Sequence, residues 1–143
     1  MEQFLDFAAR HWYLFAALFV ILGLLIGGEV MRKMRGIAAI GPNQALQLMN
    51  HEDAVLIDTR SNGEYKSGHI PEARNVPHGE IADRLKDLAK YKNKPVILYC
   101  ATGSRAGATG ASLKKDGFEN VYTLQGGLGA WQNANLPITK KDR

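Results

Sequence analysis

The sequence predicts an α/β fold with a central, mainly parallel sheet flanked by helices, preceded by one N-terminal transmembrane helix. Two observations lead to this prediction. Residues 12–28 contain no charged side chain. From residue 41 onward, short apolar segments alternate with segments of helical periodicity, which is the pattern of a parallel sheet whose strands are joined by helices.

Length and composition limit the functions that the chain can have. It has 143 residues, the size of one ordinary domain, with 18 basic and 14 acidic side chains. Its single cysteine excludes an internal disulfide framework and zinc folds held by several cysteines. The histidines, at positions 11, 51, 69 and 78, show no metal-ligand spacing. The basic residues are interspersed and lack aromatic partners, so we expect no nucleic-acid binding.

The apolar segment predicts a transmembrane helix over about 12–31, within an N-terminal region of residues 1–35. As a helix, residues 12–28 extend roughly 25 Å, the short end for a hydrocarbon core of about 30 Å. A buried core helix would have a polar face, which this segment lacks. A cleaved signal peptide would begin with basic residues, whereas Glu2 and Asp6 precede the segment. The sequence therefore favours an uncleaved anchor.

The charges beside this helix predict its orientation. Arg32, Lys33 and Arg35 follow the segment, whereas only Arg10 precedes it. Basic flanks stay in the cytoplasm, so we expect the N-terminus outside and the rest of the chain in the cytoplasm. The basic flank would also hold the anchor against anionic lipid.

A G-x-x-x-G spacing lies within the predicted helix. Gly23 and Gly27 would let two such helices pack closely and form a weak helix-mediated dimer. Glycine is also common in membrane helices that do not associate, and this second interpretation is the better supported of the two.

Residues 36–143 form the predicted second domain, in which strands and helices alternate. Pro42, after Gly41, suits the first turn of a helix, and apolar residues then follow at helical spacing. The apolar run at 54–57 ends at Asp58, as is typical of a buried parallel strand.

The later elements follow the same order. Ser61 and Glu64 fit a capping box that begins a helix, and Gly68 fits its end. Residues 73–76 indicate a short strand, and residues 81–88 a helix with one apolar face. The remaining predicted elements are a strand at 96–99, a helix at 105–115 that stops at Gly117, a strand at 121–124, a tight turn at Gly126 and Gly127, and a short helix at 128–133 that buries Trp131.

The single cysteine lies where parallel sheets bind ligands. Cys100 directly follows the strand at 96–99, and a loop leads from it into the next helix: Ala101, Thr102, Gly103, Ser104 and Arg105. Backbone N–H groups and the helix dipole favour an anion in such a loop, so we expect Cys100 to exist largely as thiolate. Gly103 permits a sharp turn, and Arg105 can bind an anion. This combination indicates covalent catalysis on an anionic substrate.

A buried structural cysteine is the alternative, and it is the usual state of a lone cysteine. A structural cysteine would be followed by an apolar loop or by more of the strand. Small polar residues, a glycine and an arginine follow Cys100 instead. We therefore favour the functional interpretation.

Three separated motifs are distributed along residues 37–138. The first runs L-I-D-T-R from Leu56 to Arg60, continues at Glu64-Tyr65 and ends G-H-I-P-E-A-R-N-V-P from Gly68 to Pro77. The second is C-A-T-G-S-R from Cys100 to Arg105, and the third is L-Q-G-G-L-G-A-W from Leu124 to Trp131. In this order they resemble the rhodanese-like domain of the sulfurtransferase family. With the N-terminal anchor, the whole chain resembles the small membrane-anchored rhodanese-like proteins of bacteria.

This resemblance implies a persulfide mechanism without a metal or organic cofactor. The Cys100 thiolate would take a sulfane sulfur from thiosulfate or a similar small anionic donor, which residues 101–105 would bind. A thiol or protein acceptor, or cyanide in an assay, would then remove the sulfur. The expected location is the cell inner membrane, with the domain on the reducing cytoplasmic side, where the thiol stays free.

Asp58 and Arg60 are candidate supporting residues because they end a strand near the same sheet edge. They either shape the electric field of the site or have a structural role, with Arg60 paired to Glu64 and Asp58 capping the next turn. We favour the structural role for Arg60 and leave Asp58 open. His69, in the Gly-His-Ile stretch, is expected to hold its loop by hydrogen bonds.

Position 106 departs from the family pattern. Many active members carry serine or threonine directly after the loop arginine, whereas this chain has Ala106. The missing hydroxyl removes one hydrogen bond near the persulfide. This departure bears on rate and substrate preference more than on the reaction class.

Three rival functions can be weighed against this one. Cell-cycle dual-specificity phosphatases and arsenate reductases resemble the domain but place five residues between cysteine and arginine, whereas four separate Cys100 from Arg105. A non-catalytic, membrane-tethered interaction module of the rhodanese-like type is the second alternative, and the presence of both residues argues against it. The third is delivery or reporting of sulfur to a membrane partner, which the sequence does not name.

Overall fold

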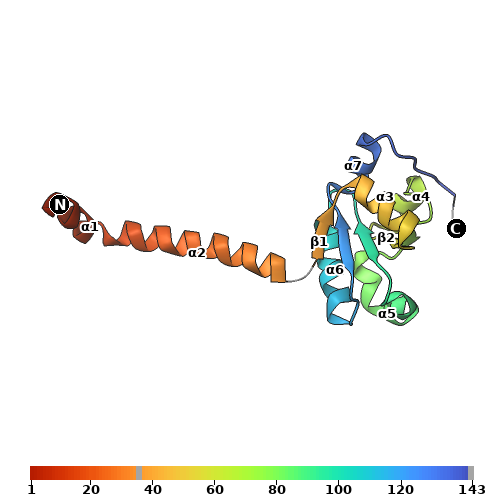
Figure 1. Ribbon diagram of the computed structural model, residues 1–143, viewed down its shortest axis with the longest axis horizontal. Coiled ribbons are helices and arrows are strands. Elements are labelled where there is room, and N and C mark those ends of the chain that lie inside the picture. Colours follow the sequence, from red (N-terminus) through yellow and green to blue (C-terminus); the bar gives the residue numbers. More distant parts are fainter. Residues whose placement is uncertain (35–36, 142–143) are drawn as a thin grey trace. The chain divides into compact units, whose positions relative to one another are not determined.

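The computed structural model describes residues 1–34 and 37–141, with the backbone alone at 32–34 and 104. The chain divides into two compact units, Met1–Arg35 and Gly36–Arg143. Figure 1 draws both units and labels the α-helices and the strands β1 and β2.

Two helices form the N-terminal unit, α1 (Glu2–Arg10) and α2 (Trp12–Met34). Within α2, the 20 residues Trp12–Met31 are long and apolar enough to cross a membrane, and none of them is buried. These bounds match the predicted transmembrane helix. The sequence analysis assigned no element to α1. The basic flank that predicted the orientation lies outside the described side chains.

The second unit is built on a five-stranded sheet in which every neighbouring pair is parallel. Its strand order is β1-β5-β4-β2-β3, which places β4 in the middle. The strands are β1 (Ile37–Ile40), β2 (Val55–Asp58), β3 (Arg74–Asn75), β4 (Val96–Tyr99) and β5 (Val121–Leu124). The predicted parallel sheet is therefore confirmed, and β1 is an additional strand that the sequence analysis missed.

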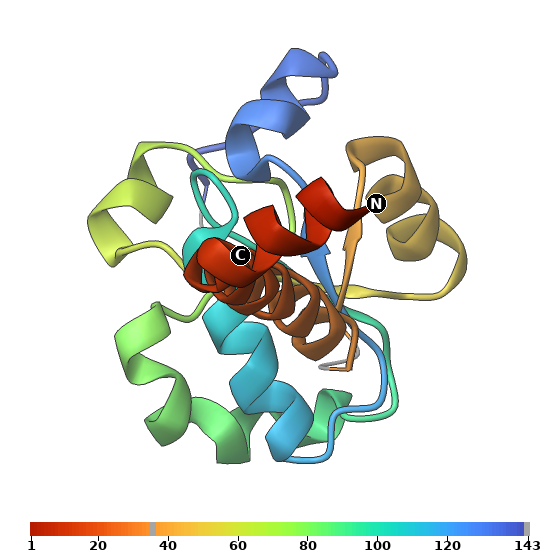
Figure 2. The same cartoon turned by 90° about the vertical axis from the view of Figure 1, so that its left-hand side faces the viewer.

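Helices cover both faces of the sheet. On one face, α5 (Ile81–Leu88) and α6 (Ser104–Lys115) pack against the apolar side chains of β4 and β5 and lie side by side (Figure 2). The other face is covered by α3 (Pro42–His51), α4 (Asn62–Ser67) and α7 (Gly127–Asn133), with Trp131 in that core as predicted. Two short 3₁₀ turns, η1 (His78–Glu80) and η2 (Ala89–Tyr91), flank α5.

Local sequence signals explain how these helices begin and end. Pro42 occupies the first turn of α3. Ser61 caps α4, because its Oγ accepts a hydrogen bond from the Glu64 backbone N–H at 3.3 Å. Gly117, at φ +98°, follows the end of α6. Since all strands are parallel, their carboxyl ends meet at one edge of the sheet, and the loop between β4 and α6 lies at this edge.

Candidate active site

Cys100 directly follows the middle strand of the sheet and is buried, with 1% of its surface exposed. Its Sγ accepts a hydrogen bond from the backbone N–H of Gly103 at 2.8 Å. Its carbonyl oxygen accepts another from the Leu128 N–H at 2.9 Å, which ties the loop to α7. The sulfur is thus held at a fixed position and already faces a backbone donor.

The loop places the N-terminus of α6 beside this sulfur. Gly103 is the N-cap residue of the helix and has φ +107°, a conformation that favours glycine. The N–H groups of a first helical turn have no partner within their own helix, and the helix dipole adds positive potential there. Ala101 and Thr102 are exposed in the loop, whereas the Ser104 side chain lies outside the described residues.

Gly127 lets α7 approach this loop closely. Its φ of +60° lies in the left-handed region, and an added Cβ would lie 2.7 Å from the carbonyl oxygen of Ala101 and closer still to that of Cys100. Together with Gly126, at φ +75°, it forms the predicted tight turn before the last helix. The third motif therefore supports the cysteine loop through its backbone.

Arg105, in the first turn of α6, forms a two-pronged ion pair with Glu64 of α4. Its Nη1 and Nη2 each lie 3.2 Å from one carboxylate oxygen of Glu64. The hydrogen bond with Arg105 lowers the pKa of Glu64, and the same bond raises the pKa of Arg105. The charge of Cys100 contributes to the rise for Arg105. The arginine is therefore available at the site as a half-exposed cation whose charge is shared with a carboxylate.

A threonine and a histidine support the same helical turn. The Thr109 hydroxyl donates to the carbonyl oxygen of Arg105 at 3.1 Å. His78 Nδ1 lies 2.8 Å from that hydroxyl oxygen and links η1 to α6. Ala106 is fully buried beneath this turn, in the same apolar cluster as Cys100.

Asp58 and Arg60 form a buried ion pair with each other. Arg60 Nη2 lies 2.7 Å from Asp58 Oδ2 and also donates to the Gly68 carbonyl oxygen at 2.7 Å. Burial acts against the charge of Arg60, but the hydrogen bonds and charge of Asp58 outweigh it and raise the pKa of Arg60. Burial, followed by the Asp58 charge, raises the pKa of the Tyr99 hydroxyl.

The predicted pairing of Arg60 with Glu64 is wrong, because Glu64 pairs with Arg105 and Arg60 with Asp58. Asp58 lies at the end of β2 and is fully buried. Its carboxylate accepts hydrogen bonds from both the backbone N–H and the guanidinium of Arg60. Glu64, on α4, is only partly buried, with 42% of its side chain exposed. Since a buried carboxylate needs a partner more than an exposed one does, the short reach and burial of Asp58 decide the pairing.

His69 is held on every side, as predicted for a residue that orders its loop. Its ring stacks on Tyr65 at 3.7 Å between centroids. Nδ1 lies 2.8 Å from the Tyr65 carbonyl oxygen, and Nε2 lies 3.1 Å from that of Lys141. Its backbone exchanges two hydrogen bonds with Thr139, which fastens the C-terminal segment to the domain.

Glu64 is the site residue that the sequence analysis missed as a partner of the cysteine loop. The sequence analysis gave Glu64 a place in the capping box of α4. The structure shows this contact, since Ser61 Oγ donates to Glu64 Oε1 at 3.2 Å. Its second partner, Arg105, lies 41 residues further along the chain, a separation at which no periodicity gives a signal.

Comparison with known proteins identifies the same family that the three sequence motifs resemble. Residues 41–134 match the family model of the rhodanese-like domain. The uncharacterized protein YibN of Escherichia coli is 30% identical over 141 residues, covering 98% of this chain and 99% of that protein. The thiosulfate sulfurtransferase GlpE of Pseudoalteromonas translucida is 34% identical over 91 residues, covering 64% of this chain and 85% of that protein.

The crystal structure of a thiosulfate sulfurtransferase from Pseudomonas aeruginosa has a similar fold. It superposes with a TM-score of 0.68 at 26% sequence identity. The match covers 80% of this chain but only 22% of that one, so the likeness concerns a part of a longer chain.

Proposed function

Because the chain belongs to the rhodanese-like domain family, we propose that it is a sulfurtransferase that carries a sulfane sulfur on Cys100. The observation that carries this proposal is the contact between the Cys100 sulfur and the Gly103 N–H, at the N-terminus of α6. A thiolate is stabilised by such a donor and by the positive end of a helix.

Sulfur transfer takes place in two balanced displacements. The Cys100 thiolate attacks the outer sulfur of thiosulfate, an Sγ–S bond forms, and sulfite leaves with the electrons of the broken S–S bond. The resulting persulfide anion carries its charge where the loop N–H groups and the α6 dipole favour it. A thiol or cyanide then attacks the outer sulfur, and the Cys100 thiolate is regenerated.

The size of the loop favours a sulfur over a phosphoryl group. Four residues separate Cys100 from Arg105, and Gly103 turns the loop inward so that its N–H contacts Sγ directly. With the Gly103 donor already at 2.8 Å from Sγ, the loop suits one added atom on the cysteine better than a tetrahedral phosphate.

Arg105 and Glu64 form the charged rim of the site. Arg105 attracts an anionic donor, while Glu64 holds the guanidinium in place and offsets part of its charge. We assign Arg105 to donor binding and Glu64 to positioning Arg105. Asp58 and Arg60 have a structural role, because they bind each other and the Gly68 backbone.

We propose in addition that α2 tethers the domain to the inner membrane, with the N-terminus outside and the domain in the cytoplasm. The length and apolar composition of Trp12–Met31 support the span, and the basic residues that follow it support the orientation. A reporter that is active only in the periplasm, fused to the C-terminus, is expected to stay silent. Periplasmic activity of the fusion would contradict the orientation.

An assay of thiocyanate formation from thiosulfate and cyanide tests the activity. The full chain in detergent is expected to turn over, and Cys100→Ser, which keeps the shape of the side chain, is expected to be inactive. An aryl phosphate serves as the parallel substrate. Hydrolysis of the phosphate that depends on Cys100 would favour a phosphatase, and failure of both reactions would favour a binding module.

A further inference from the structure

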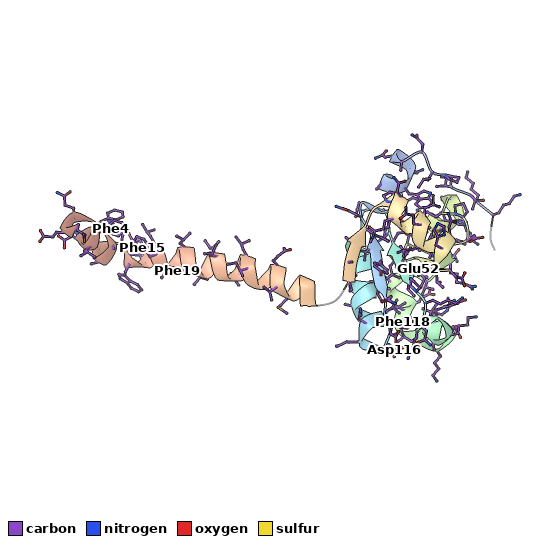
Figure 3. All side chains as sticks on the ribbon, in the orientation of Figure 1. Phe4, Phe15, Phe19, Glu52, Asp116 and Phe118 are labelled. Carbon is purple, nitrogen blue, oxygen red and sulfur yellow. The ribbon has the colours of Figure 1, made fainter. Side chains whose placement is uncertain are left out.

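The first helix, α1, has one apolar side and one polar side. On a helical wheel, Phe4, Leu5, Phe7 and Ala8 fall on one side, and Glu2, Gln3, Asp6 and Arg10 fall on the other. Phe4 and Leu5 are 65% and 62% exposed. Figure 3 shows the Phe4 side chain projecting away from the helix. An apolar stripe of this kind calls for an apolar neighbour.

This helix cannot simply lengthen the membrane span. The segment Trp12–Met31 has 20 residues and already extends about 30 Å, the thickness of the hydrocarbon core. Asp6 and Arg10 carry charges that the core excludes, and α1 on the same line as α2 would pass beyond the core into water with its apolar side exposed. The polar side of α1 therefore has to remain in water.

The chain changes direction between the two helices. His11 ends α1 with φ −122° and ψ +31°, outside the helical region, and its carbonyl oxygen accepts the Leu14 N–H at the start of α2. Figure 2 shows α1 lying across the axis of α2. Trp12 and Tyr13, the first residues of α2, are of the type that lies at the level of lipid headgroups. The start of the span therefore fixes α1 at headgroup depth.

We propose that α1 lies flat in the interface of the bilayer that α2 spans, with its apolar side in lipid and its charged side in water. The proposal rests on the proposed membrane span. The proposed span begins at Trp12, directly after α1, so the bilayer is the apolar medium next to the exposed apolar side chains of α1. The side chains of α1 include two acidic and one basic residue, so apolar burial rather than anionic lipid holds the helix.

Spin labels on single cysteines test this placement in the full chain. Because Cys100 is the only cysteine, a Cys100→Ser background allows one label at a time. The labelled positions are Phe4→Cys and Ala8→Cys on the apolar side, Gln3→Cys and Asp6→Cys on the polar side, and Leu18→Cys and Leu22→Cys in the span as matched controls. The protein is reconstituted into phosphatidylcholine vesicles, and collisions with oxygen and with a water-soluble nickel chelate are compared.

We expect labels at positions 4 and 8 to collide several-fold more often with oxygen than with the nickel chelate. Both should lie at one shallow depth, about 5–10 Å below the headgroup boundary. Labels at 3 and 6 should favour the nickel chelate. A depth that increases steadily from position 3 to 22 would overturn the proposal, as would nickel access at all four positions of α1. Broadening of the spectrum by spin–spin contact between labels at position 4 would show that the apolar side of α1 packs against a second copy of the chain, and would also overturn the proposal. Nickel access at 18 and 22 would overturn the membrane span itself, whereas sulfur transfer is tested independently.

Discussion

Arg105 is the cation that the first turn of α6 brings to the cysteine loop, and we propose that Glu64 controls how much of its charge a donor meets. Both side chains are about two-fifths exposed, so water screens their attraction and the pair can open to admit an anion. The Arg105 bond lowers the pKa of Glu64. The ion pair is therefore fully formed at pH values above the ordinary pKa of a glutamate. It is lost only when the pH falls through the lowered pKa of Glu64 and the carboxylate becomes protonated.

Glu64→Gln is expected to lower the KM for thiosulfate by about two- to fivefold, because the rim loses a negative charge while the amide oxygen still contacts Arg105. Steady-state kinetics at neutral pH measure this change. Glu119→Gln, an exposed residue between α6 and β5, makes the same change of charge away from the loop and should leave KM unaltered. A KM that rises in Glu64→Gln would show that positioning outweighs charge.

We propose that Asp58 contributes to stability rather than to the chemistry, because it is fully buried in an ion pair with Arg60. Asp58→Asn removes the charged partner of buried Arg60 and is expected to lower the free energy of unfolding by about 3–5 kcal/mol. Denaturant titration measures this loss. Asp87→Asn breaks an ion pair whose carboxylate side chain is 71% exposed and should cost less than about 1 kcal/mol. Equal costs for the two variants would contradict a structural role for Asp58.

At the scale of elements, the cysteine loop depends on the close approach of α7. Gly127→Ala is expected to lower the free energy of unfolding by at least about 3 kcal/mol, because a left-handed residue gains a Cβ that meets two carbonyl oxygens. Gly129→Ala in the same helix meets nothing within 4 Å and should be neutral or stabilising by about 0.5–1 kcal/mol. Thermal unfolding of both variants compares them, and a similar Tm would contradict this interpretation of the turn.

The elements that the sequence predicted are those whose signals are local. The apolar run at 96–99 and the glycine-containing loop after it were sufficient to place Cys100 at the end of a buried strand before a helix. β1 was missed because its sequence, Ile-Ala-Ala-Ile, is short and weakly apolar, and its pairing with β5 makes it a strand. β2 begins at Val55, one residue after the start of the apolar run, and ends at Asp58 as predicted, where Arg60 compensates the charge of the carboxylate.

The partners of the charged residues could not be predicted in this way. Arg60 has Asp58 and Glu64 on either side, and only burial at the end of β2 shows which one it binds. The pair between Arg105 and Glu64 joins α6 to α4 and depends on how the two helices meet at the sheet edge. Such contacts arise from tertiary packing, for which a single sequence carries no spacing signal.

At the scale of the whole molecule, the proposed anchor and the proposed active site belong to different units. Every residue assigned to the site lies in Gly36–Arg143, and the hydrogen bonds of Cys100, Arg105 and Glu64 stay within that unit. A chain of residues 36–143 alone is therefore expected to fold, to remain soluble and to keep the kcat of the full chain. Loss of activity in a folded, soluble truncation would show that the anchor contributes to catalysis.

The mass of the intact protein after incubation with thiosulfate tests the central claim most directly. The full chain in detergent is treated with the donor, freed of excess small molecules and measured without reductant. We expect an added mass of about 32 Da, located on Cys100 by peptide mapping and removed by cyanide, as a persulfide at the nucleophile requires. An unchanged mass, or an added sulfur that persists in Cys100→Ser, would contradict sulfur transfer through Cys100.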